Sequence, residues 1–224
     1  MKSRRHILAI FGTGQIAEMV AFYFQHDYGR DTRVFIVDDE FKVEDHAFGR
    51  PVLTSSEAAE TLEPKQTDVF VALAYSGMNT LRREKLNWVK GLGFGTVSYV
   101  SPRATIYPNV FVGENCLILE DNTLQPFTTI SDNVTLWSGN HIGHHSTIEE
   151  DAFVSSHVVI SGGVRVGKGC FLGVNCTIRD HVTLGARTLV GAGVTILGDT
   201  EEESVYIAPR TSPSERRSSQ IRGL

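Results

Sequence analysis

Residues 164–193 read VRVGKG CFLGVN CTIRDH VTLGAR TLVGAG when they are written in groups of six. The third residue of every group is Val, Leu or Ile, and the first is small or β-branched. The same phase extends from residue 104 to residue 199 and gives sixteen consecutive groups. Their third residues are Ile106, Val112, Ile118, Leu124, Ile130, Leu136, Ile142, Ile148, Val154, Ile160, Val166, Leu172, Ile178, Leu184, Val190 and Ile196. This period predicts a parallel β-helix with the branched residues stacked inside it.

The first 97 residues follow a different pattern, in which short apolar runs alternate with segments of helical spacing. Strands are expected at 6–11, 33–37 and 68–73, and helices after the first strand and at 79–93. Strands that alternate with helices predict a parallel sheet covered on both faces, which is the Rossmann-like arrangement.

The two periods divide the chain into three regions. We expect a Rossmann-like domain at 1–97, a β-helix at 98–200 and a polar tail at 201–224. The first region is too short for a complete six-strand dinucleotide fold, which disfavours an NAD-dependent enzyme.

Composition excludes several classes of function. The 224 residues carry a net charge of -5, so no basic excess marks a nucleic-acid binder. No apolar run is long enough for a membrane span, and the short apolar run at the N-terminus predicts a buried strand, not a signal peptide. Cys116, Cys170 and Cys176 lack the paired spacing of a metal site and are expected to pack inside a reduced, cytoplasmic protein.

The repeat resembles the left-handed β-helix of hexapeptide acyltransferases, and the two-part layout is similar to that of the NeuD- and PglD-like sugar acyltransferases. The likeness covers about residues 5 to 200. It implies coils of eighteen residues with three sides, a homotrimer, and acetyl-CoA bound in the groove between adjacent β-helices, with no metal. The acceptor it implies is an amino group of a nucleotide-linked sugar, such as a 4-amino-dideoxy sugar used for surface glycan synthesis.

Residues 140–148, NHIGHHSTI, hold three histidines. Acyl transfer needs a base for the proton of the attacking group, and histidine is the side chain that titrates nearest neutral pH. Aligned without gaps through residues 162–175, the resemblance implies that His144 is the catalytic base and that His145 stands where the family has an orienting acid.

Other assignments stay open for these positions. Three acidic residues could orient the base instead: Glu149, Glu150 and Asp180. His141 or His145 could be the base, or all three histidines could only cap corners by hydrogen bonding. Phe153 stands where the family has a second histidine, and His157 is a candidate substitute for it. A zinc site is not expected, because three histidines this close on an extended segment point in different directions.

The resemblance also implies where the donor binds. The matching positions are Gly162, Gly163, Val174 and Ala192, although small residues are also what tight corners require.

The acceptor's nucleotide is expected in the first region. Gly12, Thr13 and Gly14 begin a G-x-G-x-x-A pattern between a strand and a helix, where backbone N–H groups can hold phosphate. Asp38 and Asp39 end the second strand, where a carboxylate reaches a ribose or a base. By resemblance, Asn79 and Arg82 complete this site; the alternative is a helix N-cap and a solvated arginine.

The sequence therefore predicts a cytoplasmic, homotrimeric acetyltransferase that takes acetyl-CoA and an amino sugar. A sugar O-acetyltransferase of the sialic acid or polysaccharide type and a non-catalytic β-helix binding module are the alternatives.

Overall fold

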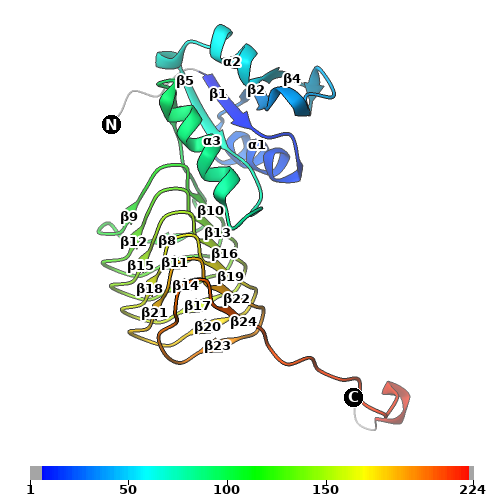
Figure 1. Cartoon of the computed structure of the whole chain (residues 1–224), viewed down its shortest axis with the longest axis vertical. Coiled ribbons are helices and arrows are strands. Elements are labelled where there is room, and N and C mark those ends of the chain that lie inside the picture. The colour runs from blue at the N-terminus through cyan, green and yellow to red at the C-terminus, as the bar shows by residue number, and fades with distance from the viewer. Residues whose placement is uncertain (1–6, 222–224) are drawn as a thin grey trace.

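The computed structural model describes residues 7–221 and has two parts, an α/β domain and a β-helix stacked end to end (Figure 1). The α/β domain contains a six-stranded sheet of order β3-β4-β2-β1-β5-β6. All neighbouring strands are parallel except β3 and β4. The strands are β1 (Ile7–Phe11), β2 (Thr32–Val37), β3 (His46–Ala47), β4 (Arg50–Thr54), β5 (Thr67–Val71) and β6 (Gly95–Thr96).

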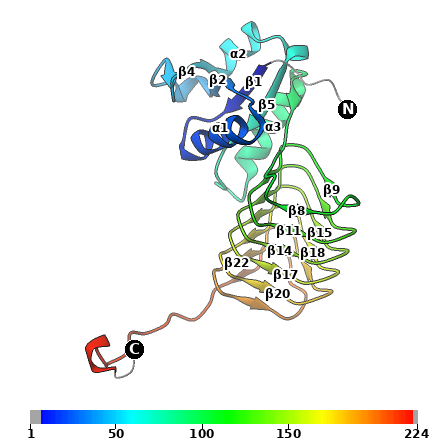
Figure 2. The ribbon, with the colours of Figure 1, turned by 180° about the vertical axis from the view of Figure 1, so that it is seen from behind.

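Three helices cover the two faces of this sheet: α1 (Gln15–Tyr28), α2 (Ser55–Thr61) and α3 (Thr80–Gly91). Because side chains alternate along a strand, Leu8 and Ile10 of β1 pack with α1, and Ala9 and Phe11 pack with α2 and α3. The helices lie on opposite sides of the sheet in Figures 1 and 2. The short 3-10 helices are η1 (Asp39–Phe41), η2 (Pro64–Gln66) and η3 (Ser218–Gln220).

The β-helix has three faces, each a parallel sheet of two-residue strands. Face I consists of β7 (Tyr99–Val100), β10 (Leu117–Ile118), β13 (Thr135–Leu136), β16 (Phe153–Val154), β19 (Phe171–Leu172), β22 (Leu189–Val190) and β24 (Val205–Tyr206). Face II consists of β8 (Thr105–Ile106), β11 (Thr123–Leu124), β14 (His141–Ile142), β17 (Val159–Ile160), β20 (Thr177–Ile178) and β23 (Thr195–Ile196). Face III consists of β9 (Phe111–Val112), β12 (Thr129–Ile130), β15 (Thr147–Ile148), β18 (Arg165–Val166) and β21 (Thr183–Leu184). The prediction of a left-handed parallel β-helix after a Rossmann-like domain is confirmed.

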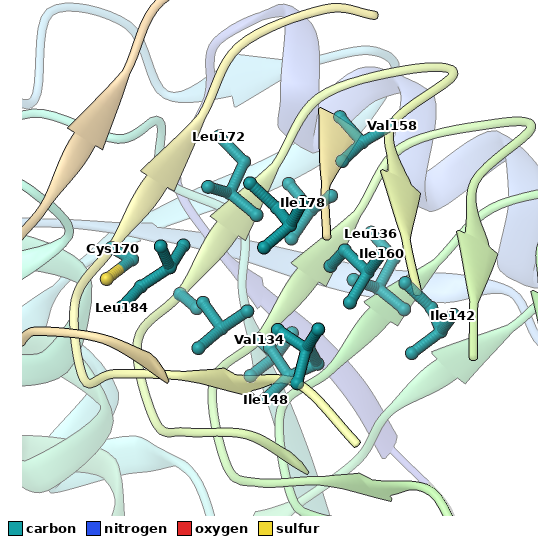
Figure 3. Close-up of a cluster of buried hydrophobic side chains, with 14 of the residues drawn as sticks. Val134, Leu136, Ile142, Ile148, Val158, Ile160, Cys170, Leu172, Ile178 and Leu184 are labelled. Atoms are coloured by element: carbon teal, nitrogen blue, oxygen red, sulfur yellow. The ribbon is translucent and has the colours of Figure 1, made fainter. Parts of the chain in front are cut away.

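The register of the coils follows from the branched third residues. Ile142 pairs with Leu124 on one side and Ile160 on the other, eighteen residues away in each direction. These side chains are buried and form the continuous apolar core drawn in Figure 3. Burial of branched aliphatic side chains therefore sets which residues of successive coils lie side by side.

The corners of the β-helix depend on the sixth residue of the six-residue group, whose φ is positive in every group from Asn115 to Gly193. Most of these residues are Asn, Asp, His or Gly, the types that adopt this left-handed conformation most readily. His145 is one of them, with φ 59°. We name the corners by the faces they join, so that residues 143–146 and 161–164 belong to corner II–III, and residues 173–176 and 191–194 to corner I–II.

The final coil departs from the eighteen-residue period. Leu189 pairs with Val205 and Val190 with Tyr206, a spacing of sixteen. The last strand, β24, thus lies beyond the expected boundary at residue 200, because a coil two residues shorter still brings it against β22. The exposed segment that follows leads away from the β-helix (Figures 1 and 2).

Candidate active site

His144 and His145 lie together at corner II–III, just after strand β14, and both are exposed. Their Nδ1 atoms are 3.1 Å apart, so that one ring donates a hydrogen bond and the other accepts it. The backbone N–H of His144 donates to the side-chain oxygen of Gln125 at 2.9 Å, in the preceding coil. The ring of His145 also packs on Phe127, with ring centroids 4.6 Å apart. His144 is thus held through Nδ1 and its backbone, and Nε2 is its other ring nitrogen.

The acidic alternatives for orienting His144 are occupied elsewhere or make no recorded contact with it. Glu149 pairs with Arg165 and accepts a hydrogen bond from the backbone N–H of Lys168 at 3.0 Å. Glu150 and Asp180 are exposed, and within residues 7–221 neither carboxylate accepts a hydrogen bond from His144. In the described structure the side chain that contacts Nδ1 of His144 is His145.

The four positions implied for the donor lie on two different corners. Gly162 and Gly163 are on corner II–III, in the coil next to His144, and a Cβ at Gly162 would lie 2.8 Å from the imidazole. Val174 and Ala192 are exposed on corner I–II. Face II separates the two pairs, so a single chain does not bring all four together.

An aromatic cavity of about 460 Å³ opens beside Val174 and Ala192. Phe153, where the resemblance implies a histidine, stacks on Phe171 with ring centroids 5.3 Å apart and planes 5° from parallel. Tyr75 and Trp137 complete its aromatic wall. Sequence reasoning missed Tyr75 and Phe171, because only the stacking of coils under the first domain brings these distant positions together. His157 is exposed at a corner and is not among the residues that line this cavity.

Two of the segments expected to bind the nucleotide, 12–14 and 38–39, lie where β1 and β2 end. Gly12 has φ 118°, and a Cβ there would lie 2.9 Å from the backbone oxygen of Ala72, so only glycine fits. Gly14 precedes α1 and leaves its first N–H groups without a side-chain cap. Thr13 lines a second cavity of about 360 Å³ that extends over η1 and β3. Backbone N–H groups at a helix N-terminus next to a cavity are suited to a phosphate group.

The two aspartates after β2 have different partners. Asp38 forms an ion pair with Lys85 of α3 at 2.9 Å. Asp39 accepts hydrogen bonds from the side chain of Ser56, its backbone N–H and the side chain of Ser55, and these bonds hold the pKa of Asp39 at about 2. Lys85 places a positive charge beside Asp38. Sequence reasoning did not anticipate this charge, because α3 is distant along the chain.

The expected role of Asn79 and Arg82 in substrate binding needs correction, because both side chains are buried between the two domains. Arg82 is 2% exposed and donates to the backbone oxygens of Val71 at 3.1 Å, Asn133 at 2.7 Å and Asn115 at 2.9 Å. Burial lowers its pKa to about 10, so that it stays charged at neutral pH.

Asn79 donates from its side chain to the backbone oxygen of Asp151 at 2.6 Å. It precedes α3 but makes no side-chain capping bond. Both residues fasten the first domain to the β-helix, and neither lines the cavity beside Thr13.

The cysteines pack as expected. Cys116, Cys170 and Cys176 are free and buried, and burial raises the pKa of each thiol to about 11 or 12. Across residues 7–221 no group of three or more His, Cys, Asp or Glu side chains is arranged to hold a metal ion. In the same stretch, every helix is too short or too polar to cross a membrane.

Comparison with known proteins gives three findings. The family model "Bacterial transferase hexapeptide (six repeats)" matches residues 163–198. No curated protein matches the chain. Among solved structures, the fold is similar to the acetyltransferase domain of PglB from Neisseria gonorrhoeae, with 24% identity, a TM-score of 0.78, and coverage of 89% of this chain and 95% of that one.

The hexapeptide-repeat match and the similarity to a solved sugar N-acetyltransferase support an acyltransferase, so the predicted enzyme class is confirmed. In particular, the chain is similar to perosamine N-acetyltransferase from Caulobacter crescentus. A variant of that enzyme in complex with CoA and GDP-perosamine is 26% identical, has a TM-score of 0.79, and covers 89% of this chain and 92% of its own. The expected resemblance to NeuD- and PglD-like sugar acyltransferases is thereby confirmed.

Proposed function

We propose that this protein transfers an acetyl group from acetyl-CoA to an amino group of a nucleotide-linked 4-amino-dideoxy sugar, for surface glycan synthesis. The observation that carries the proposal is the His144–His145 pair, with Nδ1 atoms 3.1 Å apart and the His144 ring lying over Gly162 of the next coil. The similarity to an enzyme whose structure contains CoA and GDP-perosamine supports this choice of donor and acceptor.

The His144 ring has the arrangement that a general base needs. If Nδ1 of His144 carries the proton and donates the hydrogen bond to Nδ1 of His145, Nε2 of His144 is left with a lone pair. Nε2 then takes the proton of the amine as its nitrogen attacks the thioester carbonyl. The tetrahedral intermediate collapses with cleavage of the C–S bond, Nε2 returns the proton to the leaving thiolate sulfur, and the products are the amide and CoA. His145 replaces the family's acid as a neutral hydrogen-bond acceptor.

The division of the donor residues between two corners supports a homotrimer. His144 and Gly162 lie on one edge of face II, and Val174 and Ala192 lie on the other. A groove lined by all of them requires corner II–III of one copy to meet corner I–II of the next. Three copies around an axis close such a head-to-tail contact, as heterologous interfaces do when the rotation closes.

The acceptor's nucleotide is assigned to the cleft at the carboxyl ends of β1 and β2. The Gly12-Thr13-Gly14 turn offers backbone N–H groups to the phosphates, and Asp38 or Asp39 can accept hydrogen bonds from the ribose or the base. Lys85, 2.9 Å from Asp38, supplies a cation near the phosphates. We place the reaction in the cytoplasm, where thiols such as Cys116 stay reduced.

The test is release of CoA from acetyl-CoA with a panel of nucleotide-linked 4-amino sugars and their 4-hydroxy counterparts. We expect turnover with an amino sugar and a loss of about 10²- to 10⁴-fold in kcat in His144→Ala. His26→Ala is the matched control, because His26 is an exposed histidine on α1 that lines neither cavity; its ring contacts Asp27 and Phe22. Turnover only with hydroxyl sugars would favour O-acetylation, and full activity in His144→Ala would overturn the base assignment.

A further inference from the structure

The aromatic cavity at corner I–II extends from the β-helix to the α/β domain. Its wall contains four aromatic side chains, two serines and the exposed Val174 and Ala192. Among the described residues of the α/β domain, only Tyr75 lines it. The other lining residues are Trp137, Phe153, Ser155, Ser156, Phe171 and Gly173. This single side chain therefore links the domain assigned to the nucleotide with the corner assigned to the donor.

Tyr75 is held by two aromatic contacts and by the turn that follows it. Its ring centroid lies 4.9 Å from that of Phe153 and 5.1 Å from that of Phe171, and the residue is 52% exposed. The turn that follows has positive φ at three successive residues, 77–79, and the third of them, Asn79, is bonded to the β-helix through Asp151. The ring thus packs on the aromatic pair, and about half of the residue's surface stays exposed beside the cavity.

The loop that carries Tyr75 begins next to the phosphate-binding turn. The backbone N–H of Ala72 donates to the oxygen of Phe11, and the oxygen of Ala72 lies against Gly12. Three residues later the chain reaches Tyr75 and the cavity. A substrate whose phosphates lie at Gly12 would extend along this loop toward the aromatic wall, and the group that follows the phosphates in a nucleotide sugar is the sugar.

We propose that Tyr75 positions the sugar ring of the acceptor, which lies against the aromatic wall formed with Phe153 and Phe171. This inference rests on the proposed function. A hexose has an apolar face of C–H groups and an edge of hydroxyl groups. The aromatic rings suit the apolar face, and Ser155 and Ser156 on the same wall suit the hydroxyls. Tyr75 therefore determines sugar recognition and leaves nucleotide and CoA binding to other residues.

The experiment compares wild type, Tyr75→Ala and Tyr75→Phe by calorimetry. The ligands are UDP, GDP and dTDP, a 4-amino-dideoxyhexose linked to each of them, and CoA. We expect the wild type to bind one nucleotide sugar more tightly than the matching diphosphate. Tyr75→Ala should weaken binding of that nucleotide sugar by about 10- to 100-fold, the range of a lost apolar contact of this size, with diphosphate and CoA affinities unchanged. Tyr75→Phe should keep most of the affinity, because the ring makes the contact.

Controls separate the possible outcomes. Tyr107→Ala removes another exposed tyrosine, outside the cavity, and should change nothing. An unchanged nucleotide-sugar affinity in Tyr75→Ala, or an equal loss for the diphosphate, overturns the inference alone. A changed preference among acyl-CoA chain lengths with unchanged sugar binding overturns it in favour of an acyl-group pocket. If no nucleotide sugar binds to the wild type, the proposed function and the inference both fail.

Discussion

His144 and Gly162 face each other in neighbouring coils of the β-helix, and a methyl group added to Gly162 would lie 2.8 Å from Nε2 and Cε1 of the imidazole. Real carbon contacts are longer than this, so a side chain at position 162 would force the ring of His144 to move. The absence of a side chain at Gly162 therefore keeps open the space around the nitrogen to which we assign the proton transfer.

Gly162→Ala should lower kcat without unfolding the chain. The backbone at Gly162 has no positive φ, so alanine can adopt its conformation, and the exposed imidazole can turn aside. A displacement of about 1 Å of a catalytic group costs about 100-fold in rate. Steady-state kinetics and thermal unfolding of Gly162→Ala and Gly198→Ala measure this. Gly198 is the control, since a Cβ there meets nothing within 4 Å. Equal activity in both variants would contradict the assignment of His144.

His145→Asp should shift the acidic limb of the pH–rate profile to higher pH. A carboxylate close to Nδ1 of His144 favours the charged imidazolium and so raises the pKa of His144. His144 is then protonated, and so unable to act as a base, up to a higher pH. Above that pH it is a stronger base than in the wild type. Aspartate also accepts the positive φ of position 145.

The measurement for His145→Asp is kcat against pH, with His145→Asn as the uncharged control. The asparagine variant should lack the shift. Profiles that are the same in all three proteins would mean that position 145 does not orient the base.

Arg82→Met should destabilise the fold by about 3–5 kcal/mol, because it leaves several buried oxygens without donors. Arg82→Lys should not restore stability, since a lysine cannot donate in the directions of the planar guanidinium. Urea unfolding gives the comparison. Arg83→Ala is a milder control, because its ion pair with Asp151 is only partly buried. If Arg82→Met instead raised KM for the nucleotide sugar at full stability, the role of Arg82 in fastening the first domain to the β-helix would be wrong.

Asp39→Asn should destabilise the chain at neutral pH and lose this effect in acid. Hydrogen bonds, chiefly from the side chain of Ser56, lower the pKa of Asp39 from 3.8 to about 2. A carboxyl group with a depressed pKa stabilises the folded state above its ordinary pKa, and this contribution disappears as the pH falls from about 4 to about 2. The difference in the free energy of unfolding between wild type and Asp39→Asn should shrink over that interval. A difference independent of pH would mean that the bonds from Ser56 do not depend on the carboxylate's charge.

Much of the fold and part of the site could be predicted from local patterns. The β-helix follows from the six-residue spacing of residues such as Ile142 and Ile148, which buries one branched side chain per strand. The Gly12-Thr13-Gly14 turn is likewise a local feature, because a glycine, a strand and a helix within ten residues define it. The pairing of His144 with His145 could not be predicted, since it depends on the side-chain orientation at a corner with a positive φ.

The sequence by itself determined the β-helix, its register and the alternation of strands and helices before it, because these depend on side-chain periods that each segment carries alone. The tertiary structure decided that Arg82 is buried between the two domains, where it donates hydrogen bonds to the β-helix. It also decided that the ring of Tyr75 packs on Phe153 and Phe171. It also decided that Gly162 and Val174 stand on different corners. The physical reason is that burial and contact are properties of segments brought together in space, and a guanidinium on a helix becomes an internal donor only when another domain covers it.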